Sequence, residues 1–310
     1  MRHFATPRFW RCYEALPQDV RGLADRCYTL LKTDAGVRIR IRLRVAVMVC
    51  GALAGTPLSA AELTPAASAA FDRHASLTEA RMAADLQRGA FLSCDDQASG
   101  GNRTACDELR RGGVVIRRVE TLDPDGRRIN VPGGQVHHWV GIVFVPGAPL
   151  SRVLALAQDY DRYQNLFPEV VRKSRLVERH DNDFRIKLRF RLSRILTGVV
   201  DVESDVTYVP LSASRWTITA RSTRVVEIAD ADTPAEHEYP AGRDNGYVWR
   251  TNTYWRLEER DGGTYIESEG LSLSRDVPFV FAWLVNPIVD SLSRNTLQLM
   301  LATMRRTLSG

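Results

Sequence analysis

The chain has 310 residues, of which 44% are hydrophobic and 25% charged, with 42 Lys and Arg against 37 Asp and Glu. This length provides for a sizeable core in one large domain or two small ones. The composition excludes a collagen-like or low-complexity chain, and no apolar run reaches the roughly 18 residues of a membrane-spanning helix.

The excess of basic residues lies in the first 61 residues, which hold ten basic and four acidic side chains. The rest of the chain holds 32 basic and 33 acidic side chains. A nucleic-acid partner would need its cations on the folded body of the protein. We therefore expect no nucleic-acid partner.

Residues 37–61 have the pattern of a secretory signal peptide. Four arginines precede an apolar stretch at 45–55, and small residues follow for cleavage near Ala60 or Ala61. A buried core helix is the alternative interpretation. We expect residues 1–36 to be upstream sequence from a misplaced start codon, and the mature product to be periplasmic or secreted by a bacterium.

Removal of this leader leaves two cysteines, Cys94 and Cys106. An oxidising compartment favours a disulfide between them, which would contribute roughly 3 kcal/mol by loop-entropy estimates. Zinc is the alternative, but two thiols without a nearby pair of histidines do not complete a tetrahedral site. We expect the disulfide, and neither a metal nor a cofactor.

Residues 62–133 form an N-terminal extension. Its Ala-rich part, 64–92, predicts one or two amphipathic helices, and the Cys94–Cys106 loop follows it. A short strand is expected at 114–119, and Asp123-Pro124-Asp125-Gly126 predicts a turn.

Residues 134–310 form a second region in which strands dominate. A strand at 136–144 precedes a helix at 150–160 and a short helix or turn at 163–167. Further strands are expected at 170–177, 184–192, 200–208, 216–220, 249–257 and 264–273, with a long loop at 230–244. Their two-residue alternation of apolar and polar side chains indicates an antiparallel sheet.

The chain ends in a long helix. Asn286 and Pro287 have the residue types of an N-cap and a first helical position, which predicts a helix of about 22 residues. Its apolar stripe includes Leu292, Thr296 and Leu299.

A strand, two short helices, a run of antiparallel strands and a long helix are the order of the α+β helix-grip fold. Within it, residues 159–170 read DYDRYQNLFPEV, which looks like a passage of the START-like (SRPBCC) superfamily. That superfamily includes lipid-transfer domains, coenzyme-Q-binding proteins and polyketide cyclases. The resemblance covers residues 135–308, and it implies a curved sheet wrapped around the C-terminal helix with a ligand cavity between them.

The candidates for the cavity wall, and so for ligand binding, are Phe184, Ile186, Leu188, Phe190, Trp216, Trp249, Trp255, Phe279, Trp283, Leu292, Leu299 and Met300. A core filled by these side chains is the alternative interpretation. A hydrophobic ligand needs few polar contacts, because each Å² of apolar surface removed from water contributes about 25 cal/mol.

Three polar residues are weak catalytic candidates: His138, Tyr254 and Glu267. Neighbouring strand residues point to opposite faces, so only one of His137 and His138 enters the cavity, and the apolar alternation selects His138. Glu267 and Glu269 share a strand face, which we expect to point outward. A lone inward histidine is more often a hydrogen-bonded core residue than a catalytic one.

Two charged rows face each other in the predicted sheet. Basic residues alternate over 185–191, and acidic residues alternate over 201–205. A phosphate-binding face should not carry its own acidic row. We therefore expect cross-strand ion pairs between Arg185, Lys187, Arg189, Arg191 and Asp201, Glu203, Asp205.

These features predict an exported, non-catalytic protein that binds or carries a lipid, an isoprenoid or a quinone and makes transient contact with a membrane. One alternative is a cyclase- or hydrolase-type enzyme of the same superfamily. Another is an envelope interaction module whose own side chains fill the cavity.

Overall fold

The computed structural model describes residues 62–95, 108–192, 198–240, 242–276 and 279–309. For the C-terminal helix, side chains are described from Ser293 onward. Ala60–Leu192 and Gly198–Gly310 belong to one compact unit, so the N-terminal extension and the strand-rich region share it. The predicted leader and Cys106 lie outside the described residues.

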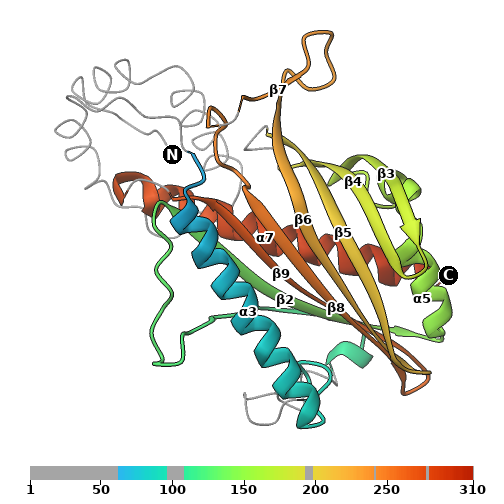
Figure 1. Cartoon of the computed structure of the whole chain (residues 1–310). Helices are drawn as coiled ribbons and strands as arrows, with labels where there is room; N and C mark the ends of the chain where they lie inside the picture. Colours follow the sequence, from blue (N-terminus) through green and yellow to red (C-terminus); the bar gives the residue numbers. More distant parts are fainter. Residues whose placement is uncertain (1–61, 96–107, 193–197, 241, 277–278, 310) are drawn as a thin grey trace, which may run out of the picture. The chain divides into compact units, whose positions relative to one another are not determined.

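Among the described residues, a nine-stranded antiparallel sheet forms the centre of this unit (Figure 1). The strand order is β1-β2-β9-β8-β6-β5-β4-β3, and β7 pairs with β6. The strands are β1 (Val114–Arg118), β2 (Gly134–Pro146), β3 (Val171–His180), β4 (Asp183–Arg191), β5 (Val199–Ser212), β6 (Arg215–Ala229), β7 (His237–Glu238), β8 (Arg250–Arg260) and β9 (Gly263–Arg275). Every predicted strand is present, and the described part of the loop expected at 230–244 contains only the two-residue β7.

A two-residue turn, Asp261-Gly262, connects β8 to β9. Asp261 and Gly262 both have positive φ, +57° and +76°, which a two-residue hairpin turn requires and which glycine adopts without steric cost. β2 then pairs with β9 over its whole length, from Gly134 opposite Arg275 to Pro146 opposite Gly263. β2, β9 and β8 are therefore in fixed register through the middle of the sheet.

The predicted helices are present, with one correction. α5 (Leu150–Gln158), η2 (Tyr160–Arg162) and α6 (Tyr163–Leu166) follow β2, and α7 (Phe279–Leu308) ends the chain. The prediction that the last helix begins at Pro287 is wrong, because α7 starts eight residues earlier. Proline lacks one backbone hydrogen bond, but the helix continues through it. No helix among the described residues combines the length and apolar character needed to cross a membrane.

α7 approaches the sheet closely at Gly141 of β2. A Cβ at this position would lie 2.7 Å from Leu301 Cδ1 and 3.0 Å from Leu297 Cδ2, so a larger residue would displace these leucine side chains. The residues of α7 that pack toward the sheet core are Leu297, Met300, Leu301, Met304 and Leu308. The expected stripe through Thr296 and Leu299 is therefore rotated by about one residue.

The N-terminal extension packs on the other side of the sheet. Its long helix, α3 (Pro65–Gln87), is capped by Thr64, whose hydroxyl accepts a hydrogen bond from the Ala67 amide at 3.1 Å. In Figure 1, α3 crosses in front of the strands and α7 runs behind them. After α3, Cys94 Sγ lies 3.8 Å from an Arg260 nitrogen, and the disulfide to Cys106 stays a prediction.

Candidate ligand-binding site

Side chains alternate between two faces of the sheet, which we name the α7 face and the α3 face after the helices that cover them. On β2 the odd-numbered residues lie on the α7 face, because Gly141 contacts Leu297 and Leu301 of α7. The register of β2 with β9, and of β9 with β8, then assigns the even-numbered residues of β9 and the odd-numbered residues of β8 to the α7 face.

One part of the α7 face is filled by side chains. The Tyr208 hydroxyl donates to the Ala157 carbonyl at 2.9 Å, and Tyr160 donates to the Tyr208 hydroxyl at 2.7 Å. Tyr163 donates to the same carbonyl at 2.6 Å, and the ring of Phe184 meets Tyr160 edge-on at 5.7 Å. Burial raises the pKa of Tyr160 and Tyr163 well above the usual value, so both stay neutral. The passage that resembles the START-like superfamily therefore fills one part of the α7 face.

A second part of the α7 face is open. We call it the open section, and it consists of Trp139, Thr251, Thr253, Trp255, Gly270 and Ser272, all of which are half-buried. Among the residues whose side chains the structure describes, no atom lies within 4 Å of the position that a Cβ on Gly270 would occupy. Gly270 lies directly opposite Trp139 on β2 and Thr253 on β8. The empty space therefore lies over the middle of the sheet.

The same strands are more deeply buried on the α3 face. Asn252, Tyr254 and Arg256 alternate with the open-section residues of β8 and are all buried, as are Glu269 and Leu271 on β9. A core packed equally on both faces would bury both sets alike. The lower burial on the α7 face therefore marks unfilled space.

Apolar side chains border this space. Ala220 lies opposite Thr253, and Leu297 and Met300 of α7 pack against the neighbouring buried core. All three are half-buried. Together with Trp139 and Trp255 they form a wall that offers apolar surface to a ligand.

The predicted ligand-binding residues divide between the two parts of the α7 face. Phe184, Ile186 and Leu188 belong to the buried core, as the alternative interpretation of a filled cavity expected. Phe190, Trp216, Trp255 and Met300 are half-buried and pack against that core. Of the predicted residues whose side chains are described, Trp255 alone lies within the open section itself.

Other predicted residues do not reach this wall. Trp249 packs with Phe71 on the α3 face, contrary to the expectation that it faces the cavity. It precedes the first residue of β8, so the strand alternation does not extend to it. Leu299 is half-buried on α7. The side chains of Phe279, Trp283 and Leu292 lie outside the described residues.

The polar candidates form a buried network on the α3 face. His138 Nε2 lies 2.6 Å from Glu269 Oε1, and its Nδ1 lies 3.0 Å from the Thr121 hydroxyl. Arg256 lies 2.7 Å from Glu267 and 3.2 Å from Glu269, and Arg81 of α3 also pairs with Glu269. Glu267 and Glu269 thus point away from α7, as expected, but the extension buries them to 0% and 1% exposure.

The prediction that His138 enters the cavity is wrong. It rested on the apolar alternation through Val140, Ile142 and Phe144, which serves the α3 face instead. There Ile142 and Phe144 pack against Phe91 of the extension. Tyr254 also lies on the α3 face, where its hydroxyl donates to Glu79 of α3 at 2.8 Å.

The network sets the charge of Glu269. Burial alone would raise the pKa of Glu269, but the hydrogen bond from His138 and the charges of Arg81 and Arg256 outweigh it and lower the pKa to about 2. The pKa of His74 on α3 is also lowered, but for a histidine this shift favours the neutral form. Burial, followed by the charge of His138, lowers the pKa of His74 to about 4, which keeps it neutral near pH 7.

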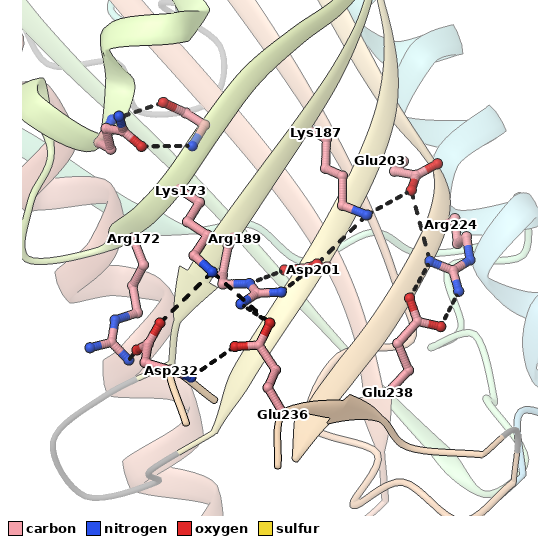
Figure 2. Close-up of polar contacts among 12 residues, drawn as sticks. Arg172, Lys173, Lys187, Arg189, Asp201, Glu203, Arg224, Asp232, Glu236 and Glu238 are labelled. Carbon is pink, nitrogen blue, oxygen red and sulfur yellow. Dashed lines mark hydrogen bonds and ion pairs between the residues drawn. The ribbon is translucent and has the colours of Figure 1, made fainter. Parts of the chain in front are cut away.

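The two charged rows pair across β4 and β5, as expected. Figure 2 shows Lys187 and Arg189 reaching the acidic residues of the next strand. Lys187 lies 3.1 Å from Glu203, and Arg189 lies 2.6 Å from Asp201. Arg185 lies 3.1 Å from Asp205, whereas Arg191 lies opposite Val199. The basic row is therefore largely neutralised by its neighbours.

Sequence reasoning missed Trp139, Gly270 and Ser272. A usable signal was present, because Ser268, Gly270, Ser272 and Ser274 place small residues at every α7-face position in the second half of β9. A strand that packed against a filled core would carry larger apolar side chains there. A row of small residues on one face of a central strand thus indicated empty space.

Comparisons with known proteins give likenesses to solved structures. No protein-family model matches the chain, and no curated protein matches its sequence. Three similar structures are the STAR-related lipid transfer protein from Xanthomonas axonopodis (18% identity, TM-score 0.39, covering 57% of this chain and 96% of that one), the Zhui aromatase/cyclase from Streptomyces sp. R1128 (16%, 0.38, 56% and 95%) and human STARD10 (14%, 0.39, 67% and 79%). At these TM-scores the likenesses carry no argument about a ligand.

The observed arrangement itself has the expected architecture. A strand, two short helices, a run of antiparallel strands and a long C-terminal helix packed on the sheet occur in the predicted order. The chain has a START-like, α+β helix-grip fold with an added N-terminal extension.

Proposed function

We propose that this protein is a carrier that holds a hydrophobic ligand on the open section of the α7 face. The observation that supports this function is the empty space at Gly270 between half-exposed apolar side chains. The same strands are tightly covered on the α3 face. A protein that only needed stability would fill both faces.

Burial of apolar surface supplies the binding energy. A ligand that covers about 200 Å² of apolar surface gains about 5 kcal/mol at roughly 25 cal/mol per Å². Such a ligand needs only one or two polar contacts for orientation. A lipid, an isoprenoid or a quinone has this combination of a long apolar body and a small polar end.

We also propose that the protein works outside the cytoplasm, in the periplasm or after secretion. The support comes from the sequence at 37–61, which has the pattern of a signal peptide. A disulfide between Cys94 and Cys106 belongs to this proposal, because that compartment is oxidising. Loading and release of an apolar ligand would take place during transient contact with a membrane.

The enzyme alternative has less support. Its polar participants, His138, Tyr254 and Glu267, all lie on the α3 face, and His138 and Glu267 are held in the network beneath α3. They do not converge on the open section. A ligand held against the α7 face would be separated from them by the sheet.

Filling the open section tests the carrier function directly. Gly270→Leu places a side chain in this space, and its Cβ meets no described atom within 4 Å, so the variant should fold with little change in Tm. Native mass spectrometry of protein purified from its own host should show a co-purifying apolar ligand for the wild type. The variant should lose at least nine-tenths of it.

Val209→Leu is the matched control, since it adds apolar volume at an exposed strand position and should keep the ligand. A wild-type protein without extractable ligand that also binds no added lipid would overturn the carrier function. Full retention of ligand by folded Gly270→Leu would show that the ligand is held elsewhere.

A further inference from the structure

The two outermost strands of the sheet, β3 and β1, differ in how their outer edges are covered. On β3, the Ser174 amide donates to Gln164 Oε1 at 3.3 Å, and the Leu176 amide donates to Asp161 Oδ1 at 2.8 Å. Two register shifts also interrupt the pairing of β3 with β4. Side chains that cap edge amides, together with bulges, keep an edge strand from pairing with another chain. The β3 edge is therefore protected.

The outer edge of β1 lacks this protection. Its five residues pair with β2 in one unbroken register. The Val119 amide donates to the His138 carbonyl, so by antiparallel alternation Val115 and Arg117 bond to β2, whereas the N–H and C=O of Ile116 point away from it. In the described part of the chain, no group forms a hydrogen bond with Ile116 on that side. β1 thus presents a regular backbone edge with unused donors and acceptors.

α7 holds this edge in place. Arg305 Nε donates to the Phe144 carbonyl at the end of β2, and Arg305 Nη1 donates to the Gly112 carbonyl just before β1, each at 3.1 Å. Gly112 has a φ of +101°, a conformation that favours glycine. The start of β1 is therefore fixed to both β2 and α7. A strand that is already ordered loses little conformational freedom when a partner binds.

The surroundings of the β1 edge are rich in positive charge. The cations on β1 and on the segments next to its first residue are Arg111, Arg117, Arg118, Arg305 and Arg306. Of these, Arg111 and Arg117 are exposed and form no ion pair with a described acidic residue. Glu108 and Glu120 flank this stretch, and Glu120 already pairs with another arginine. Since successive strand residues point to opposite faces, Arg117 and Arg118 place cations on both sides of the edge.

From this combination we propose that the β1 edge is a docking site for an extended acidic segment of another protein, which adds a strand to the sheet. The backbone of that segment would bond to Ile116, and its carboxylates would meet Arg111 and Arg117. A second copy of this chain fits less well, because it would bring the same arginines to the contact. The site belongs to the N-terminal extension and is independent of any ligand in the open section, so it goes beyond the carrier function.

Fluorescence polarisation with two labelled nine-residue peptides tests the charge requirement. One peptide has the sequence Glu-Asp-Thr-Val-Thr-Val-Thr-Asp-Glu, and the other has Lys at the four acidic positions. The purified protein should bind the acidic peptide with a Kd at least 10-fold lower than that of the basic one. Arg111→Glu combined with Arg117→Glu should abolish this preference. Arg152→Glu combined with Arg175→Glu changes the net charge equally at exposed positions of α5 and β3 and should keep it.

Ile116→Pro tests the backbone requirement. Proline removes the outward N–H, which β2 does not use, and should raise the Kd of the acidic peptide at least 5-fold. Ile116→Val keeps the amide and should bind as the wild type does. An acidic peptide that is N-methylated at its central threonine and at both valines loses backbone donors without any change to the protein. It should bind at least 5-fold more weakly, which decides the matter even if Ile116→Pro folds poorly.

Equal binding of the acidic and basic peptides by the wild type would refute the docking site. So would unchanged binding of the N-methylated peptide, because simple charge attraction, as to single-stranded DNA or an anionic vesicle, would then suffice. Sedimentation velocity supplies a further check. A dimer that disappears in Arg111→Glu with Arg117→Glu, together with no binding of either peptide, would assign the edge to a second copy instead. None of these results bears on ligand retention by Gly270→Leu, so the carrier function stands or fails separately.

Discussion

On the α3 face, the central strands β8 and β9 carry buried charges and aromatic side chains beneath a helix that pairs with them. On the α7 face, the same strands carry hydroxyls, a glycine and a half-exposed tryptophan beside empty space. One pair of strands therefore serves two purposes. A polar network in which every charge has a partner specifies one arrangement of its elements. An unfilled surface lacks the energy of close packing but leaves room for a ligand.

This difference changes the meaning of the N-terminal extension. Arg81 and Glu79 of α3 reach Glu269 and Tyr254 of the sheet, so the extension completes a network that the strand-rich region begins. Phe71 adds an apolar contact with Leu271 and Leu273. We infer that contacts on the α3 face offset much of the packing energy that is absent at the open section.

The largest effect should come from breaking the network on the α3 face. Arg256→Met removes the cation that lies between Glu267 and Glu269 and leaves two buried carboxylates without it. We expect the free energy of unfolding to fall by about 3–5 kcal/mol, as measured by denaturant titration.

Arg185→Met is the matched control for that change. Arg185 is 52% exposed in its pair with Asp205, so its loss should lower the free energy of unfolding far less than Arg256→Met does. An equal drop in the free energy of unfolding for the two variants would mean that the buried network on the α3 face stabilises the protein no more than an exposed ion pair does.

The next largest effect should distinguish the filled part of the α7 face from the open part. Leu301→Ala creates a cavity in the buried core and should lower the free energy of unfolding by about 2–5 kcal/mol. Met300→Ala, one residue earlier on α7, should cost about 1 kcal/mol because Met300 is already half-exposed. The same denaturant titration measures both, and similar costs would argue against unfilled space near Met300.

Acid should weaken the α3 face in two steps. His74 is neutral in the folded protein down to about pH 4 but takes up a proton near pH 6.5 when unfolded, so stability is lost as the pH falls from 6.5 to about 4. The pKa of Glu269 is lowered from 4.5 to about 2, so its contribution to stability is lost as the pH falls from about 4.5 to about 2. His74→Gln should flatten the upper part of a plot of Tm against pH and leave the lower part unchanged. A profile identical to that of the wild type would exclude His74 as the source of the upper step.

The smallest effect should come from the exposed end of the charged rows. Asp205→Asn removes the partner of Arg185 and should lower the free energy of unfolding by less than about 1 kcal/mol. Since such pairs are screened by salt, the difference from the wild type should shrink toward zero in 0.5 M NaCl. A cost that persists at high salt would show that Asp205 contributes by packing or by hydrogen bonding.

The sequence predicted the strands well because a two-residue period is a strong and local signal. It also predicted the pairing of Lys187 with Glu203 and of Arg189 with Asp201, since opposite charges alternate on successive strands. The assignment of faces was less predictable. Helices cover both faces of this sheet, so β2 has apolar residues at both odd and even positions, and alternation alone could not show which set meets α7.

The open section was harder to predict for a related reason. Its signal is a deficit, namely small residues such as Gly270 and Ser272 where larger ones would fill a core. The position of Trp139 follows only from the register of β2 with β9. The start of α7 was missed because Pro287 has the residue type of a first helical position, and nothing local indicates that the helix begins before it.

The short strand β1 has a consequence for where the folding unit begins. It pairs with β2 from Arg118 opposite Trp139 to Val114 opposite Val143, and so covers the central backbone of a long apolar strand. A protein truncated at residue 134 would expose the whole free edge of β2, which is a template for strand addition between copies. Such a fragment should aggregate by edge-to-edge pairing, so a fragment that keeps this edge covered must begin before Val114.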